Sequence, residues 1–190
     1  FVSTLNDLLT LRVIELTHDE FDLPEVKWCW LALGSEGRYE QTLCTDHDNG
    51  IIFECEDATA APALRQQFLP FAQAVNQKLD ACGFPLCKGG IMAGNPQWCL
   101  SLPEWRARFR DWIEHPQPKA LLNAAIFFDF RPLYGFETLS DALRTWLLEA
   151  TRDAQLFLRQ MADNALQCAP PLGLIRDFVF DDNKDYPNTL

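Results

Sequence analysis

Two short apolar runs constrain the fold of this chain more than any other feature of its sequence. Residues 28–33 and 49–55 are each about as long as one β-strand, and apolar and aromatic side chains dominate both. Runs of this length and composition predict strands that are buried inside the protein. Neither run approaches the ~20 apolar residues that a bilayer-spanning helix requires, so a membrane protein is not expected.

Apolar residues at helical spacing surround these strands. We expect a first helix with Ser3 as its cap and an apolar face formed by Leu5, Leu8, Leu9, Val13 and Leu16. A second helix is expected over residues 63–81, where Pro70 interrupts or kinks it. Residues 101–104 have the form of a capping box, which predicts that a third helix begins there.

The last third of the chain predicts further helices and one more strand. Residues 119–125 favour a helix, residues 126–133 favour a strand, and Thr138 is placed to cap a long helix that reaches about residue 166. The order of elements indicates an α+β (α/β) core followed by a helical C-terminal part. Because the sequence starts at Phe1 without a methionine, we expect a piece of a larger multidomain protein.

Composition narrows the possible partners and the compartment. The chain carries 16 basic and 27 acidic residues, a formal net charge of -11, and this charge disfavours binding to DNA or RNA. A nucleotide can still bind, because a metal ion reverses the local field. The seven cysteines include no CxxC pair and predict free thiols in the cytoplasm. A zinc site formed by Cys82, Cys87 and Cys99 is the alternative, although it lacks the usual ligand spacing.

Three features between residues 33 and 131 point to chemistry. Gly34 and Ser35 end the first predicted strand, where glycine allows close approach of a ligand and the hydroxyl and backbone N–H groups can hold phosphate. Asp46 and Asp48 open the second predicted strand, where residues two apart point to the same side. Two adjacent carboxylates repel unless a cation lies between them, and such hard oxygen ligands favour Mg²⁺ or Mn²⁺.

The third feature is Asp129, which lies among phenylalanines in the last predicted strand. A carboxylate in such surroundings is costly to bury unless it is paired. Either Arg131 is its ion-pair partner, or Asp129 is a further metal ligand on a neighbouring strand, and the spacing leaves both possibilities open.

The combined layout resembles that of the polymerase-β-like nucleotidyltransferases. Residues 34–49 (GSEGRYEQTLCTDHDN) closely resemble the signature of a bacterial nucleotidyltransferase family, known as domain of unknown function 294. That family is related to the N-terminal domain of the PII-protein uridylyltransferase. Residues 89–98 and 127–131 resemble the same family, and the similarity covers most of the chain. His47 departs from the expected residue between the carboxylates; it either approaches a metal-bound water or points into the core.

The resemblance implies a fold, a division of the chain and a metal site. The expected fold is a small mixed sheet flanked by helices, with the nucleotidyltransferase core over residues 1–135 and a helical segment with its tail over residues 136–190. Asp46, Asp48 and Asp129 would be the catalytic carboxylates and would bind two Mg²⁺ or Mn²⁺ ions.

The resemblance also implies how the nucleotide is held. Gly34, Ser35 and Thr45 would bind the nucleotide, with Gly34 and Ser35 on the β- and γ-phosphates. Arg38 and Arg131 would balance phosphate charge, unless each is instead held in an ion pair with a nearby carboxylate.

The implied activity is the transfer of NMP from an NTP to an acceptor in bacterial signal transduction. The acceptor would be a regulatory protein or a small molecule, and the fused modules would be CBS and cyclic-nucleotide-binding domains. The alternative is a non-catalytic nucleotide-sensing module. An HD-type phosphohydrolase is disfavoured, because it needs several histidine ligands on helices and His47 opens a strand.

Overall fold

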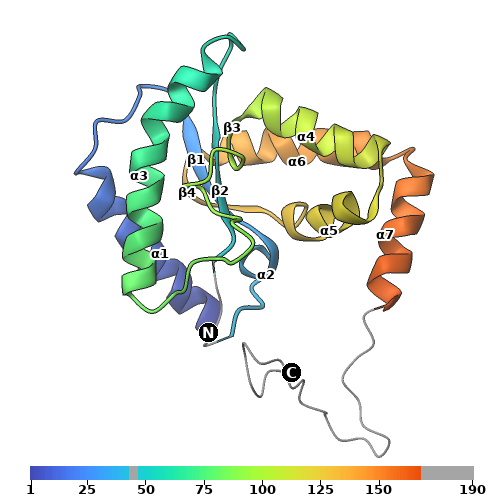
Figure 1. Ribbon diagram of the computed structural model, residues 1–190, viewed down its shortest axis with the longest axis horizontal. Coiled ribbons are helices and arrows are strands. Elements are labelled where there is room, and N and C mark those ends of the chain that lie inside the picture. The colour runs from blue at the N-terminus through green and yellow to red at the C-terminus, as the bar shows by residue number, and fades with distance from the viewer. Residues whose placement is uncertain (43–46, 168–190) are drawn as a thin grey trace, which may run out of the picture.

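The protein is built on a four-stranded mixed sheet in the order β3-β2-β1-β4. The computed structural model describes residues 1–42 and 47–167 (Figure 1). Strand β1 pairs antiparallel with both β2 and β4, and β2 pairs parallel with β3. The strands are β1 (Trp28–Ala32), β2 (Asn49–Phe53), β3 (Cys99–Ser101) and β4 (Arg131–Gly135). The predicted α+β fold is confirmed.

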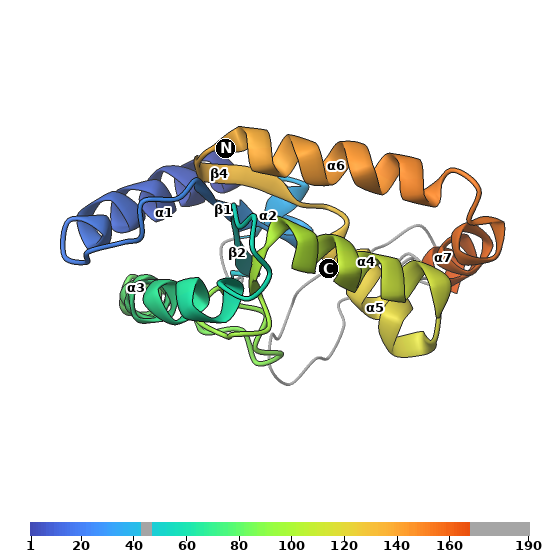
Figure 2. The same cartoon turned by 90° about the horizontal axis from the view of Figure 1, so that it is seen from above.

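Helices cover both faces of this sheet. Helices α1 and α3 lie on one side, and α4, α5 and α6 lie on the other, as both views show (Figures 1 and 2). Helix α2 is a single turn directly after β1. The bounds are α1 (Val2–His18), α2 (Gly34–Gly37), α3 (Ala61–Ala81), α4 (Leu102–Glu114), α5 (Pro118–Phe127), α6 (Glu137–Thr151) and α7 (Gln155–Gln167).

The apolar runs predicted as buried strands are β1 and β2. Each of them contributes residues to two separate hydrophobic clusters, one on either face of the sheet. From β1, Cys29 and Leu31 join the cluster on the α4 side, whereas Trp28 and Trp30 join the cluster on the α1 and α3 side. Successive residues of a strand point to opposite faces, so a strand covered on both faces has no polar positions. This explains why β1 reads as a continuous apolar run.

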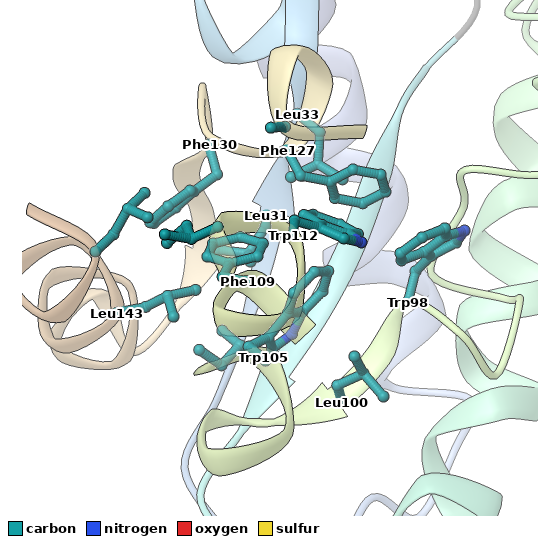
Figure 3. Packing of buried hydrophobic residues seen from close by; sticks show 14 of the residues in the cluster. Leu31, Leu33, Trp98, Leu100, Trp105, Phe109, Trp112, Phe127, Phe130 and Leu143 are labelled. Carbon is teal, nitrogen blue, oxygen red and sulfur yellow. The ribbon is translucent and has the colours of Figure 1, made fainter. Parts of the chain in front are cut away.

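The larger cluster is aromatic and centres on α4. Figure 3 shows Trp105, Phe109 and Trp112 of α4 packed near Phe127 of α5. The capping box predicted at the start of this helix is present: the Ser101 backbone N–H donates to Glu104 Oε2 at 2.8 Å, and the Glu104 N–H donates back to Ser101 Oγ at 3.4 Å. The cap fixes the direction in which α4 leaves β3.

The first helix buries a different face from the one that was predicted, although Leu9 and Val13 of the predicted face are partly buried against the cluster on the α1 and α3 side. Helix α1 begins at Val2, and Ser3 is buried inside it rather than capping it. The exposed fractions are 55% for Leu5, 60% for Leu8 and 49% for Leu16. The helix turns mostly polar residues toward α3 and the rest of the chain, namely Ser3, Asn6, Thr10, Ile14 and Thr17. Specific polar contacts outweigh the leucine pattern, as the Asn6 amide donating to buried Gln41 Oε1 at 3.1 Å illustrates.

Several boundaries in the second half also differ from the prediction. Helix α5 continues to Phe127, and β4 begins only at Arg131, so Asp129 precedes the strand instead of lying within it. The long helix expected from Thr138 is two helices, α6 and α7, separated at residues 152–154, and Thr138 does not cap it. Strand β3 lies in a stretch for which no strand was predicted.

Helix α6 packs on the same sheet as the rest of the chain, with Leu139 and Leu143 in the α4-side cluster. The division at residue 135 stays a prediction. None of the described helices combines the length and the apolar character needed to cross a membrane.

Candidate functional site

The turn α2 is the centre of the candidate site. It follows β1 directly, and its first residue, Gly34, has a φ of +53°, a backbone conformation that glycine adopts without strain. The turn is closed by hydrogen bonds from the Gly37 N–H to Leu33 O at 3.1 Å and from the Arg38 N–H to Gly34 O at 3.0 Å. The earlier N–H groups of a helical turn have no acceptor inside it and are therefore available to an anion.

Asp48 lies against the beginning of this turn. The backbone N–H of Leu33 donates to Asp48 O at 3.0 Å, which continues the pairing of β1 with β2. A Cβ atom placed on Gly34 would lie 3.5 Å from Asp48 Oδ2. The antiparallel pairing thus brings a carboxylate to the residue that the sequence placed in the phosphate-binding turn.

Asp129 lies at the other end of the turn. A Cβ atom on Gly37 would lie 1.8 Å from the carbonyl oxygen of Asp129, so only glycine fits there. The Asp129 carboxylate accepts a hydrogen bond from Arg38 Nη1 at 2.8 Å, and Arg38 Nε donates to Glu40 at 2.7 Å. The hydrogen bond to Glu40, and to a lesser degree that to Asp129, raises the pKa of Arg38 above its usual value, although partial burial opposes the shift.

The partner of Asp129 is therefore Arg38, and the pairing with Arg131 that the sequence allowed is not formed. For Arg38, the ion-pair alternative to a phosphate contact is observed. The two carboxylates, Glu40 and Asp129, hold the Arg38 guanidinium beside the end of α2.

The carboxylates of Asp48 and Asp129 are ligands of the type that a divalent cation prefers, but they do not form a complete metal site by themselves. Asp48 and Asp129 offer hard oxygen ligands at the two ends of α2, the donor type that Mg²⁺ prefers. Thr45 and Asp46 lie outside the described residues. Within residues 1–42 and 47–167, no three His, Cys, Asp or Glu side chains gather as metal ligands, so the cysteine zinc site considered from the sequence is wrong.

The comparison with protein families decides the assignment. Residues 1–119 match the sequence profile of the family described as "Putative nucleotidyltransferase DUF294". The chain belongs to this family. No curated protein and no solved structure matches it significantly.

In this DUF294 chain, Arg131 is engaged with the protein itself. Its Nη2 donates to Asp7 Oδ1 at 2.6 Å and to Glu36 O at 3.1 Å. The side chains of Arg131 and Asp7 are each only 13% exposed. The guanidinium also lies 4.0 Å from the ring of Tyr39, which has a φ of +60°. These contacts favour a role for Arg131 in holding α2 against α1 over the phosphate contact expected from the resemblance.

A buried pair lies under the same turn. His47 Nδ1 is 3.2 Å from Glu36 Oε2, and their side chains are 4% and 2% exposed. The two atoms are close but not aligned for a hydrogen bond. The His47 ring packs edge-on against Phe84 at 4.3 Å between centroids. Of the two orientations considered for His47, the one into the core is confirmed.

The loop before β3 is tied to the residue that follows Asp48. Asn49 donates its backbone N–H to Ile91 O at 3.1 Å, and its side-chain Oδ1 accepts the Ala93 N–H at 2.8 Å. Asn76 of α3 donates to the same Oδ1 at 3.1 Å. The second stretch that resembles the family therefore borders the Asp48 side of the turn; that it covers a nucleotide stays a prediction.

Sequence reasoning missed the residues that support the turn from other elements. Ile126 approaches Gly34 directly, and Asp7 acts through Arg131, which bonds the Glu36 carbonyl; no motif marks Asp7 or Ile126. The one available signal was the polar side of the first helix, where Asn6 and Thr10 recur at helical spacing and are buried.

Proposed function

We propose that this DUF294 domain is a metal-dependent nucleotidyltransferase that moves an NMP group from an NTP to an acceptor hydroxyl. One observation supports this proposal above the others: the glycine-initiated turn lies between two acidic residues, with the Asp48 carboxylate beside Gly34 and the Asp129 carboxylate bonded to Arg38 at the end of the turn. Family membership supports the general class of reaction.

The turn would bind the triphosphate. Gly34 allows close approach, and the Ser35 hydroxyl with the free N–H groups at the start of α2 would bind the β- and γ-phosphate oxygens. Arg38 lies at the end of the same turn and would contact these oxygens if the phosphate displaced its carboxylate partners, Glu40 and Asp129. Thr45 is proposed as a further nucleotide contact.

Asp46, Asp48 and Asp129 would hold two Mg²⁺ or Mn²⁺ ions. Bound there, the ions would neutralise triphosphate charge and polarise the reacting oxygens. This contribution matters because the chain has a net charge of -11 and would otherwise repel a triphosphate.

The reaction itself is a displacement at the α-phosphorus. The acceptor oxygen forms a new bond to phosphorus, the bond to the β-phosphate oxygen breaks, and pyrophosphate leaves. Asp129 would help to take up the proton of the acceptor hydroxyl, a role that the resemblance to the family implies. The acceptor would be a regulatory protein, by similarity to PII uridylylation, or a small molecule.

Calorimetry with ATP, UTP, GTP and CTP tests the binding half of this proposal. We expect Mg²⁺-dependent binding of at least one NTP and a loss of tenfold or more in Asp48→Asn. Asp80→Asn, an exposed carboxylate on α3, serves as the matched control and should bind as the wild type does. Equal binding by all three proteins, or binding without Mg²⁺, would contradict the metal assignment.

The transfer half is tested with radiolabelled NTP. Label from the α-phosphate, and none from the γ-phosphate, should pass to an acceptor fraction with release of pyrophosphate. Label transferred from the γ-phosphate would contradict nucleotidyl transfer.

The ion pair between Arg38 and Asp129 favours one alternative function. If Asp129 stays engaged by Arg38, the domain binds a nucleotide without transferring it and acts as a sensor. Mg²⁺-dependent binding with no pyrophosphate release from any acceptor fraction would support this alternative over the transferase.

A further inference from the structure

A pocket of about 790 Å³ opens between the loop before β3 and helices α4 and α5. Its volume falls within the range of small-molecule sites. Figure 1 shows that loop and α5 on opposite sides of the lower end of β2, with α2 close by. The residues that matter here are Ile91 and Trp98 before β3, Arg108 on α4, and Lys119, Asn123 and Ile126 on α5.

Two lining residues connect this pocket to the turn α2. Ile126 Cγ2 would lie 3.4 Å from a Cβ atom placed on Gly34, which itself borders Asp48. Ile91 O accepts the backbone N–H of Asn49, the residue after Asp48. The pocket therefore begins where the proposed triphosphate site ends.

The pocket is lined by charged and polar side chains, among them Asp111, which lies 3.1 Å from His115 Nδ1. Arg108 and Lys119 form no close ion pair in residues 1–42 and 47–167, although Glu104 and Asp111 lie near enough to Arg108 to favour its charged form. The side-chain amide of Asn123 makes no hydrogen bond within the same residues. The Arg108 guanidinium lies 5.2 Å from the centroid of the Trp98 ring. Figure 3 places Trp98 at the edge of the aromatic cluster, with its indole nitrogen directed away from Trp112.

These groups suit a planar heterocycle. Arginine planes and aromatic rings stack on nucleobases, and amide and ammonium groups bond to their edges. Ile91 and Ile126 supply apolar walls, as small-molecule sites usually have. Arg108 and Lys119 outnumber Asp111, the one carboxylate among the described residues that line this pocket, and this balance favours an anionic ligand such as a nucleotide.

We infer that this pocket receives the nucleoside end of the triphosphate, with the base beside the Arg108 plane and its edge bonded by Asn123 and Lys119. The inference rests on the proposed function, because it assumes that the phosphates lie on α2. It assigns to α4 and α5 the recognition of the nucleotide, while α2 and its carboxylates would bind the phosphates.

Comparison of Mg²⁺-NTP with Mg²⁺-tripolyphosphate separates the two sites. Tripolyphosphate has no nucleoside, so its affinity reports on α2 alone. In the wild type we expect at least one NTP to bind tenfold or more tighter than tripolyphosphate. Arg108→Ala and Asn123→Ala should each remove most of this difference and leave the affinity for tripolyphosphate unchanged.

Arg110→Ala is the matched control. Arg110 lies two residues further along α4, with its guanidinium 5.5 Å from the Trp146 ring, and lines a different pocket between α4 and α6. This variant should bind both ligands as the wild type does. Circular dichroism spectra of all variants must overlay that of the wild type.

The outcomes distinguish the two proposals. If tripolyphosphate binds and no NTP binds more tightly, or if both pocket variants behave like Arg110→Ala, the nucleoside assignment is overturned and the phosphate site stands. If neither tripolyphosphate nor any NTP binds, the proposed function fails and this inference fails with it.

Discussion

Replacing Gly37 with alanine should destabilise the protein through a single contact. The added Cβ would lie 1.8 Å from the carbonyl oxygen of Asp129 and 2.8 Å from its carbonyl carbon, whereas such contacts are not found below 3.0 Å. The two backbone segments must therefore separate by more than ~1 Å, in a part of the protein packed at interior density. Phe130, the next residue, is 1% exposed and belongs to the α4-side core, so the shift cannot be confined to the surface.

Overpacking of this kind typically costs about 1–3 kcal/mol, and a clash between backbone atoms lies at the upper end. We expect a loss of about 3 kcal/mol of unfolding free energy, which for a chain of this size lowers Tm by about 6–12 °C. Thermal and urea unfolding followed by circular dichroism measure both quantities. In the control variant Gly89→Ala the new Cβ meets its nearest neighbour at 3.6 Å, and the change should stay within about 0.5 kcal/mol. A Tm for Gly37→Ala within 2 °C of that control, by the ~2–4 °C per kcal/mol scale, would refute the reasoning.

Two further predictions concern buried groups. Asp7→Asn and Arg131→Met should each lower the free energy of unfolding by about 3 kcal/mol, because each leaves an almost buried charge without its partner. The double variant should lose less than the sum of the two single losses. Additive losses in urea unfolding would contradict the pairing. Burial is the main reason that the pKa values of Cys29 and Cys99 are raised to about 12. In the native protein at pH 8, iodoacetamide should therefore label exposed Cys82 roughly a thousandfold faster than either of these two cysteines. Peptide mass spectrometry measures the rates. Equal rates in the folded protein would show that these strands are not buried as described.

The sequence predicted well the parts of the fold in which local pattern and burial agree. The runs that became β1 and β2, the helix over α3 and the capping box of α4 each satisfy propensity and packing together. The first helix shows the opposite case. Three of its leucines are exposed and a mostly polar face is buried, because Asn6 and Asp7 find partners in segments more than 30 residues away, which periodicity does not reveal.

The candidate site was predictable in its residues but only partly in its contacts. The motif placed Gly34 and Asp48 in one region, and the β1–β2 pairing brings them together. The partner of Asp129 was not predictable, because Arg38 and Arg131 both lie near it and the choice depends on where α5 ends. With β4 starting two residues after Asp129, Arg131 points its donors to α1 and α2, and Arg38 takes the carboxylate.

Paramagnetic broadening tests the central claim, that α2 binds the metal-triphosphate, most directly. Mn²⁺ with a non-hydrolysable NTP should broaden the backbone amide signals of residues 34–37, Asp48 and Asp129 in the ¹⁵N-labelled protein. Signals from α7, which both views place away from α2, should persist, as should all signals with Mg²⁺ in place of Mn²⁺ (Figures 1 and 2). Broadening centred on any other element, or unchanged broadening around α2 in Asp48→Asn, would contradict the account.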